Sequence, residues 1–320
     1  IYHRGKKYEV NQLLTNNPEQ ALKQAKVSTN SGYWLEGSQI DNELCPFTGA
    51  DLSDSKQRMM FQNLIPLAES RARRRENITC EEEERSRLGL EIETYFSLSD
   101  GDMSRVRRAN IFTGEEELLH LSYIPAAQLI QVNVKDRKRT AKGFPLGMET
   151  GIWHTSLESA QNNARPDETV EEVKSVMPYA HDTADSLYIE PLKSLNLESN
   201  GVLALQYALK RAIEIHFQIE PSELGVTNMG GSETPNIFIY EAAEGSLGIL
   251  SQLTSDIEVF RTIIKKAIEV CRYEIDPSPT PATYDDLLSY YNQPHHQELD
   301  RWDIQDALNK LLACHIELAS

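Results

Sequence analysis

The sequence contains few cysteines and no hydrophobic run long enough for a membrane span. Its four cysteines are widely scattered and form no CxxC pair: Cys45, Cys80, Cys271 and Cys314. This spacing argues against a disulfide framework and favours reduced thiols, so we expect a cytoplasmic protein. No apolar run approaches the roughly 18 residues that cross a bilayer, and we therefore expect no membrane partner.

Motifs of nucleotide-binding and hydrolytic enzymes are also missing. The sequence has no GxxxxGK[ST] loop, GxGxxG fingerprint, GxSxG elbow, HExxH helix or EF-hand loop. We therefore assign no catalytic residue, no metal site and no cofactor to this chain. The opening IYHRGKKYEV has no start methionine and no signal or transit character. This predicts a fragment of a longer protein whose preceding part carries the main activity.

Charge is distributed unevenly along the chain. The net charge of −17 over 320 residues argues against a protein that coats nucleic acid without selectivity. Two basic runs, 71–75 and 135–142, are nevertheless candidates for DNA contact, and 135–142 is favoured because it follows a predicted strand and can meet several phosphates as a loop. Their candidate side chains are Lys135, Arg137, Lys138, Arg139 and Lys142, then Arg71, Arg73, Arg74 and Arg75. The alternative for each run is solvated charge that balances nearby acids.

The pattern of apolar residues predicts an α+β fold. Residues 1–155 form a β-rich module in which strands are predicted at 6–14, 90–96, 118–124 and 128–134, with helices at 17–25 and 79–89. Residues 156–172 are polar and without periodicity, which indicates a linker or a surface insertion.

Residues 173–320 are predicted to form a mixed α/β domain that ends in helices. Apolar runs predict strands at 173–179, 185–192 and 236–242. Helices are predicted at 201–217 and 255–271, each with one apolar stripe. Two last helices follow a proline-rich joint at 276–282.

Two acids and two glycines lie at the end of the predicted strand 236–242 and just after it. Glu241 and Glu244 could hold a cation or act as acid and base, as in a nuclease. The favoured interpretation is a structural motif, completed by Gly245 and Gly248, which caps a helix start and binds a neighbouring segment. A second stretch, LCPFTGADL at 44–52, resembles a zinc knuckle in which Thr48 stands in place of the second cysteine. It is either an ordinary proline–glycine turn or a former knuckle.

Two segments carry a family resemblance. IYEAAEGSLGILSQL and YDDLLSYYNQPHHQELDR resemble the domain of unknown function that ends MrfA-type helicases and contains the MrfA zinc-binding domain. The N-terminal stretch and residues 71–96 are similar to the segment between the helicase core and that domain in bacterial superfamily 2 helicases. The resemblance implies an accessory region that positions DNA, or couples it to a motor encoded upstream, in DNA repair or phage defence. ATP and magnesium are then expected only in that motor.

The resemblance also implies a zinc site that this sequence has largely lost. Where the family has C-Y-D-C, this chain has TYDD, with Thr283 and Asp286 in place of the two cysteines, and Cys271 is the one counterpart of a family ligand. A single thiolate cannot hold structural zinc, which takes four ligands. Thr283 and Asp286 are spaced as a helix N-cap and its third residue. We therefore hypothesise that a helix cap replaces the metal.

The stretch 284–301 contains the adjacent histidines His295 and His296. On a helix they point about 100° apart, so they cannot easily share a metal. A folded corner is favoured, in which polar side chains satisfy backbone groups and Arg301 forms an ion pair or contacts a DNA phosphate. The backbone-binding candidates are Asn292, Gln293 and Asp300.

The strong negative charge supports an alternative from another class. The chain is then a protein-interaction module that docks a partner subunit of a defence complex and does not bind DNA itself. DNA binding by the isolated chain discriminates between the two hypotheses.

Overall fold

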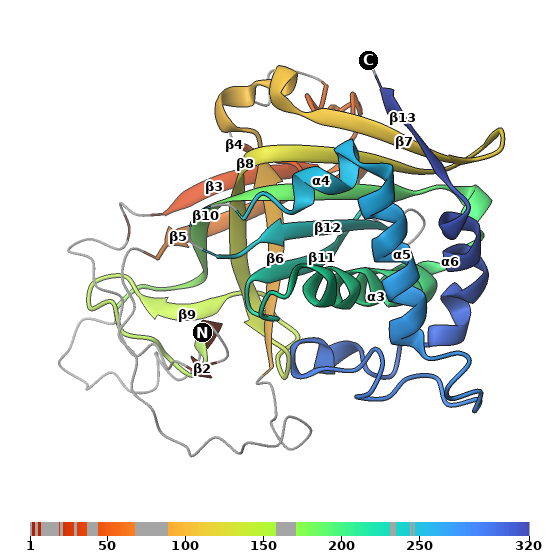
Figure 1. Ribbon diagram of the computed structural model, residues 1–320. Helices are drawn as coiled ribbons and strands as arrows, with labels where there is room; N and C mark the ends of the chain where they lie inside the picture. Colours follow the sequence, from red (N-terminus) through yellow and green to blue (C-terminus); the bar gives the residue numbers. More distant parts are fainter. Residues whose placement is uncertain are drawn as a thin grey trace. The chain divides into compact units, whose positions relative to one another are not determined.

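The computed structural model describes residues 2–3, 6–7, 19, 22–28, 31–36, 44–67, 89–157, 171–230, 235–243, 245 and 247–319. These residues form an α+β fold, as the sequence predicts (Figure 1). Within this described part, no helix is both long and apolar enough to cross a membrane.

The chain divides into two compact units that are not contiguous in sequence. Unit 1 is drawn from 1–78, 88–97 and 129–182, and unit 2 from 79–87, 98–128 and 183–320. The division expected from the sequence, at 155 and 173, is contiguous and differs from this one. The reason is that two long strands, β8 (Glu116–Asp136) and β10 (Val173–Pro191), each supply residues to both units.

Unit 1 is built on strands. They are β3 (Lys23–Ser28), β4 (Trp34–Glu36), β5 (Arg58–Pro66), β6 (Leu90–Ser97) and β9 (Phe144–Gly147), with the short β1 (Tyr2–His3), β2 (Lys6–Lys7) and the 3-10 turn η2 (Ser55–Gln57). β3 pairs antiparallel with β4 and β5, β5 runs parallel to β10, and β9 runs antiparallel to β10. The predicted helix 17–25 is wrong at 23–25, because these residues pair with β5 as a strand.

The core of unit 1 is aromatic and β-branched. Ile130, Val132 and Val134 alternate along β8, and all three are buried with Trp34 and Phe61. This period of two is what a strand requires to place one set of side chains on a single face.

Unit 2 combines strands with all the described α-helices. Its further strands are β7 (Arg107–Thr113), β11 (Leu224–Met229), β12 (Asn236–Glu241) and β13 (His315–Ala319). Its helices are α3 (Ser199–Phe217), α4 (Leu250–Ser255), α5 (Ile257–Cys271) and α6 (Gln305–Leu312). Five 3-10 turns join them: η3 (Ser99–Gly101), η4 (Met103–Arg105), η5 (Lys193–Leu195), η6 (Tyr290–His295) and η7 (Arg301–Ile304).

The core of unit 2 lies between its strands and its helices. Alternate residues of four strands are buried in one cluster: Ala109 and Ile111, Leu119 and Leu121, Leu187 and Ile189, Ile237 and Ile239. Helix α3 packs against β11 and β12, α5 packs against α3 and α6, and α4 and α6 pack against β7 (Figure 1). The apolar stripes predicted on 201–217 and 255–271 form the facing surface, since Leu205, Phe260 and Ile264 are all buried.

The structure corrects two further expectations for the C-terminal half. After α6 the chain does not end in a helix, because β13 adds antiparallel to β7. The strands predicted at 118–124 and 128–134 are one strand, β8, which Ala126 interrupts with a φ of 49°. Asp185 stabilises this irregularity by accepting hydrogen bonds from the Ala126 amide at 2.8 Å and the Tyr123 hydroxyl at 2.6 Å.

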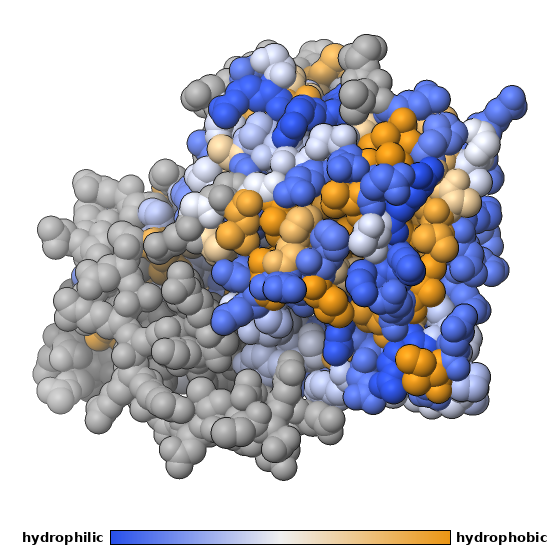
Figure 2. All heavy atoms as spheres, viewed as in Figure 1, coloured by the Kyte–Doolittle hydropathy of each residue, from blue (hydrophilic) through white to orange (hydrophobic). Residues whose placement is uncertain are grey.

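Hydrophobic side chains are scattered over the surface of unit 2. Figure 2 shows orange residues mixed with blue ones where α4 and α5 lie. The exposed large hydrophobic residues include Leu247, Ile275 and Ile215. Single exposed apolar residues are normal for a soluble surface.

Candidate functional site

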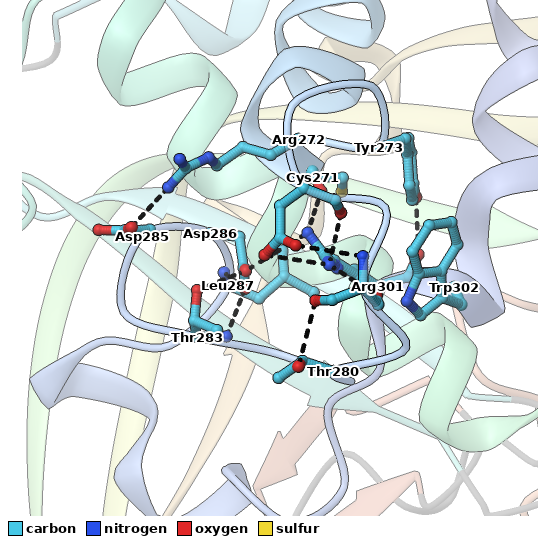
Figure 3. A network of polar contacts seen from close by, with 12 residues as sticks. Cys271, Arg272, Tyr273, Thr280, Thr283, Asp285, Asp286, Leu287, Arg301 and Trp302 are labelled. Atoms are coloured by element: carbon cyan, nitrogen blue, oxygen red, sulfur yellow. Dashed lines mark hydrogen bonds and ion pairs between the residues drawn. The ribbon is translucent and has the colours of Figure 1, made fainter.

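A buried polar network joins four segments in the C-terminal part of unit 2 (Figure 3). The segments are the end of α5, the proline-rich loop 276–282, the turn 283–288 and the 3-10 turn η7. Two of its charged members, Asp286 and Arg301, are completely buried. Burial of charge is costly unless each charge is paired and hydrogen-bonded, so the partners of these two side chains define the site.

The Asp286 carboxylate closes the turn 283–288. One oxygen accepts hydrogen bonds from the Thr283 amide at 2.7 Å and the Leu287 amide at 2.5 Å, and the other accepts from the Thr283 hydroxyl at 2.6 Å. The prediction that Thr283 caps a helix is therefore wrong, because the residues that follow Thr283 form a turn and not a helix. The Thr283 hydroxyl donates to the carboxylate instead of accepting from an amide, because the buried carboxylate needs donors.

Arg301 is the centre of the network. Its guanidinium donates to three carbonyl oxygens, those of Cys271 at 3.0 Å, Asp276 at 2.8 Å and Ser278 at 3.1 Å. It also forms ion pairs with the carboxylates of Asp276 at 3.5 Å and Asp286 at 3.8 Å. The expectation that Arg301 contacts DNA is thus corrected, because a fully buried guanidinium is not offered to a phosphate. The ion pair is the interaction that the structure contains.

The backbone of Arg301 is held as firmly as its side chain. Its amide donates to the Pro281 carbonyl at 2.8 Å, and its carbonyl accepts from the Tyr273 hydroxyl at 2.6 Å. Asp300 caps η7 by accepting from the Trp302 amide at 2.9 Å, and the Trp302 ring centroid lies 5.0 Å from the guanidinium carbon. Asp300 therefore satisfies a backbone group, as the sequence predicts.

The two adjacent histidines belong to the neighbouring corner. Buried Asn292 accepts from the Ser289 amide at 2.8 Å and donates to the Leu287 carbonyl at 2.7 Å. The His296 Nε2 lies 3.0 Å from the Asn292 side-chain oxygen, and the His295 Nδ1 lies 2.9 Å from Glu298. Gln293 lies within η6. The stretch 284–301, whose adjacent histidines raise the question of a metal site, therefore forms a hydrogen-bonded corner.

The donor atoms near Cys271 do not suit structural zinc. Zinc takes four thiolate, imidazole or carboxylate ligands, whereas Thr283 offers a hydroxyl and Asp286 is already bound to Thr283 and Arg301. Burial, above all, raises the pKa of the Cys271 thiol to about 12. Across the residues that the structure describes, no three His, Cys, Asp or Glu side chains are grouped so that they could hold a metal ion.

The stretch 44–52 retains a turn without its second sulfur. The Gly49 amide donates to the Cys45 carbonyl at 2.7 Å, and Gly49 has a φ of 70°, which a glycine adopts without strain. The Thr48 hydroxyl accepts from the Ala50 amide at 3.4 Å. Backbone hydrogen bonds thus close this turn.

Glu241 lies at the end of β12 and is 2% exposed. Each of its carboxylate oxygens accepts two backbone amides: one binds Leu247 at 2.5 Å and Gly248 at 3.0 Å, and the other binds Ile249 at 2.9 Å and Leu250 at 3.0 Å. Gly245 and Gly248, with φ values of 79° and 68°, give the loop its tight path. Glu244 lies outside the described residues. The carboxylate of Glu241 is occupied in holding the loop before α4, and this leaves it poorly placed for acid–base chemistry.

Three cations of the basic run 135–142 have partners within unit 1. Lys135 pairs with Glu91 at 3.4 Å and Lys142 with Glu93 at 3.9 Å, while Arg139 donates to the Thr155 carbonyl at 2.6 Å. These contacts agree with the alternative hypothesis, in which the cations of this run balance nearby acids.

Arg137 and Lys138 form the tip of the turn that follows β8, and both are exposed. The Asp136 carboxylate fixes this tip by accepting from the Lys138 amide at 2.9 Å. Gly89 lies against Arg137, and the Arg137 amide donates a hydrogen bond to the Gly89 carbonyl. The other basic run, with Arg71, Arg73, Arg74 and Arg75, lies outside the described residues.

Sequence reasoning missed that Asp286 and Arg301 are partners. The two residues are separated by a stretch with one proline, two histidines and no periodicity, so no helical or strand spacing connects them. It also missed Asp276 and Tyr273. The one signal available was the presence of an acid and an arginine in a segment poor in other basic residues.

Comparisons with known proteins are consistent with the resemblance inferred from the sequence. Residues 205–274 match the family model described as the MrfA Zn-binding domain. A comparison with curated protein sequences finds no match. A similar solved structure is the DUF1998 helicase MrfA bound to DNA, with 12% identity and a TM-score of 0.35, covering 70% of this chain and 25% of that chain. The same helicase bound to DNA and AMPPNP gives 12% identity and a TM-score of 0.24, with 64% and 21% covered.

The chain spans about a quarter of the length of the first of these helicase structures. The family match, by contrast, falls on the residues from within α3 to just after α5, which supply part of the core of unit 2. The resemblance to MrfA-type helicases is thereby confirmed over residues 205–274, the segment that matches the MrfA Zn-binding domain.

Proposed function

We propose that this chain is an accessory region of an ATP-dependent DNA helicase, which positions DNA or couples it to a motor encoded upstream. The observation that carries the proposal is the family match at 205–274, because MrfA is described as a DUF1998 helicase. The sequence has no phosphate-binding loop of its own, so ATP and magnesium are assigned to the motor. DNA repair or phage defence is the process that the resemblance implies.

We further propose that DNA contact is made by Arg137 and Lys138. Both side chains are exposed, and within the described residues neither has an ion-pair partner, in contrast to Lys135 and Lys142. An exposed cation without a partner loses little by binding a phosphate, since no existing ion pair must be broken. The turn itself is fixed by Asp136 and Gly89, which favours a defined position for the two charges.

The double variant R137A/K138A tests this contact. We expect duplex DNA affinity to fall roughly tenfold at low salt, and the slope of log affinity against log salt to fall by about 2, because two phosphate contacts are removed. Fluorescence anisotropy over a salt series measures both quantities.

A matched control is K193A/K265A, which removes the same charge from exposed positions of unit 2. A nonspecific effect of net charge would weaken binding equally in both double variants. An unchanged salt slope in R137A/K138A would remove this turn from the DNA interface.

The net charge of −17 favours a second candidate, a module that docks a partner subunit of a defence complex. A chain of this charge repels DNA at long range, and repulsion is strongest at low salt. If the unmodified chain is folded and binds no DNA at low salt, the DNA-positioning function is contradicted and the docking function is the candidate that remains.

A further inference from the structure

We infer that the Arg301 guanidinium takes the place of a metal ion as the cation that ties together the C-terminal segments of unit 2, so that this chain folds without zinc. The inference is independent of DNA binding. It starts from a disagreement between the family that matches residues 205–274, which is named for zinc binding, and the side chains that this sequence provides.

The matched residues themselves cannot supply a structural zinc site. Between 205 and 274 the sequence has one cysteine, Cys271, and one histidine, His216. Structural zinc sites use four cysteine or histidine ligands, so at least two more would have to come from beyond this segment. Within the network the Cys271 thiol interacts with a tyrosine hydroxyl, a guanidinium and the Asp286 carboxylate, and this carboxylate already accepts hydrogen bonds from Thr283 and Leu287.

Arg301 makes the connections that a metal would make. Through its guanidinium it binds the last residue of α5, the loop at Asp276 and Ser278, and the turn held by Asp286. Through its backbone it binds Pro281. One residue thus cross-links four segments that are otherwise joined by a loop rich in proline and without regular structure.

The chemistry of the guanidinium suits this position. Arginine is planar, stays charged when buried and donates in several fixed directions, which lysine does not. The Cys271 carbonyl lies at the C-terminal end of α5, where the helix dipole favours a cation. The Asp286 carboxylate, 3.8 Å away, neutralises the buried charge. The charged side chains of Arg301 and Asp286 therefore provide the cross-link that a bound metal ion provides in a zinc site.

The first test is elemental analysis of the intact purified chain, together with thermal unfolding followed by circular dichroism. We expect no stoichiometric zinc, and the same unfolding temperature with and without a strong chelator. Stoichiometric zinc, or a chelator that lowers the unfolding temperature, would overturn the inference.

The second test removes the charges one at a time. R301Q leaves the buried Asp286 carboxylate without its cation, and we expect it to lower the unfolding temperature by about 10 °C. D286N leaves Arg301 with Asp276 as its remaining carboxylate, so we expect a loss that is somewhat smaller. The double variant R301Q/D286N leaves two neutral amides, so its loss should be clearly smaller than the sum of the single losses. If R301Q fails to fold, D286N and the zinc measurement still decide the question.

The matched control is R261Q in the same unit. Arg261 also donates through its guanidinium to a backbone carbonyl, that of Cys314 at 2.9 Å, but more than a third of its side chain is exposed. We expect a shift of at most about 3 °C, because solvent can replace its contacts. Equal shifts in R261Q and R301Q, or additive losses in the double variant, would contradict a central role for the Arg301–Asp286 pair.

Discussion

Replacement of Glu241 by alanine will lower the free energy of unfolding by about 5 kcal/mol, because four backbone amides, two of them buried, lose a charged acceptor at once. The four amides, those of residues 247–250, point at a carboxylate that is 2% exposed, so water cannot easily take its place. Urea unfolding followed by circular dichroism measures the loss.

Glutamine at position 241 provides an isosteric comparison. E241Q keeps one oxygen that can accept two amides, but its NH2 group faces the other two, so we expect about 3 kcal/mol of destabilisation. The control is E220A, since Glu220 is exposed and its loss should cost less than about 0.5 kcal/mol. Stability of E241A within error of E220A would show that the loop before α4 does not depend on the carboxylate.

Truncation of Phe260 to alanine should cost about 4 kcal/mol, through lost burial and the cavity left behind. Phe260 lies on α5, is 1% exposed and belongs to the cluster that joins α3, α5 and the strands of unit 2. Helices α3 to α6 all lie in unit 2, so far-ultraviolet circular dichroism during urea unfolding follows their loss.

The matched control for Phe260 is I215A on α3. Ile215 is 48% exposed, so its truncation removes little buried surface and should cost less than about 0.5 kcal/mol. If F260A and I215A unfold at the same urea concentration, α5 is not packed as the structure has it.

Helices with strong amphipathic stripes were predictable because their signal is local. The stripe that begins at Val202 recurs through Leu205 and Leu209, and each of these residues is buried on α3. Strand β3 was mistaken for part of a helix because the alternation in KQAKVS is weak and a proline precedes it at a helix-start spacing. The conformation of β3 is decided by its pairing with β5, and this pairing cannot be read from the residues of β3 alone.

Candidate sites were predictable only as far as local spacing reaches. The interval between Thr283 and Asp286 correctly indicated a hydrogen-bonded pair, yet it could not tell a helix cap from a closed turn. Both assignments place the same two residues in contact. Whether the Thr283 hydroxyl donates or accepts a hydrogen bond depends on the burial of the Asp286 carboxylate, and burial is a property of the tertiary structure.

The sequence by itself determined the α+β class, the apolar faces of α3 and α5, the family resemblance of residues 239–253 and the scarcity of zinc ligands, since each depends on residue type or short-range periodicity. Only the tertiary structure decided that Arg301 faces inward to Asp286 and that Arg137 and Lys138 face solvent. The physical reason is that a charged side chain is placed by desolvation and by partners distant in sequence, and no local pattern encodes either.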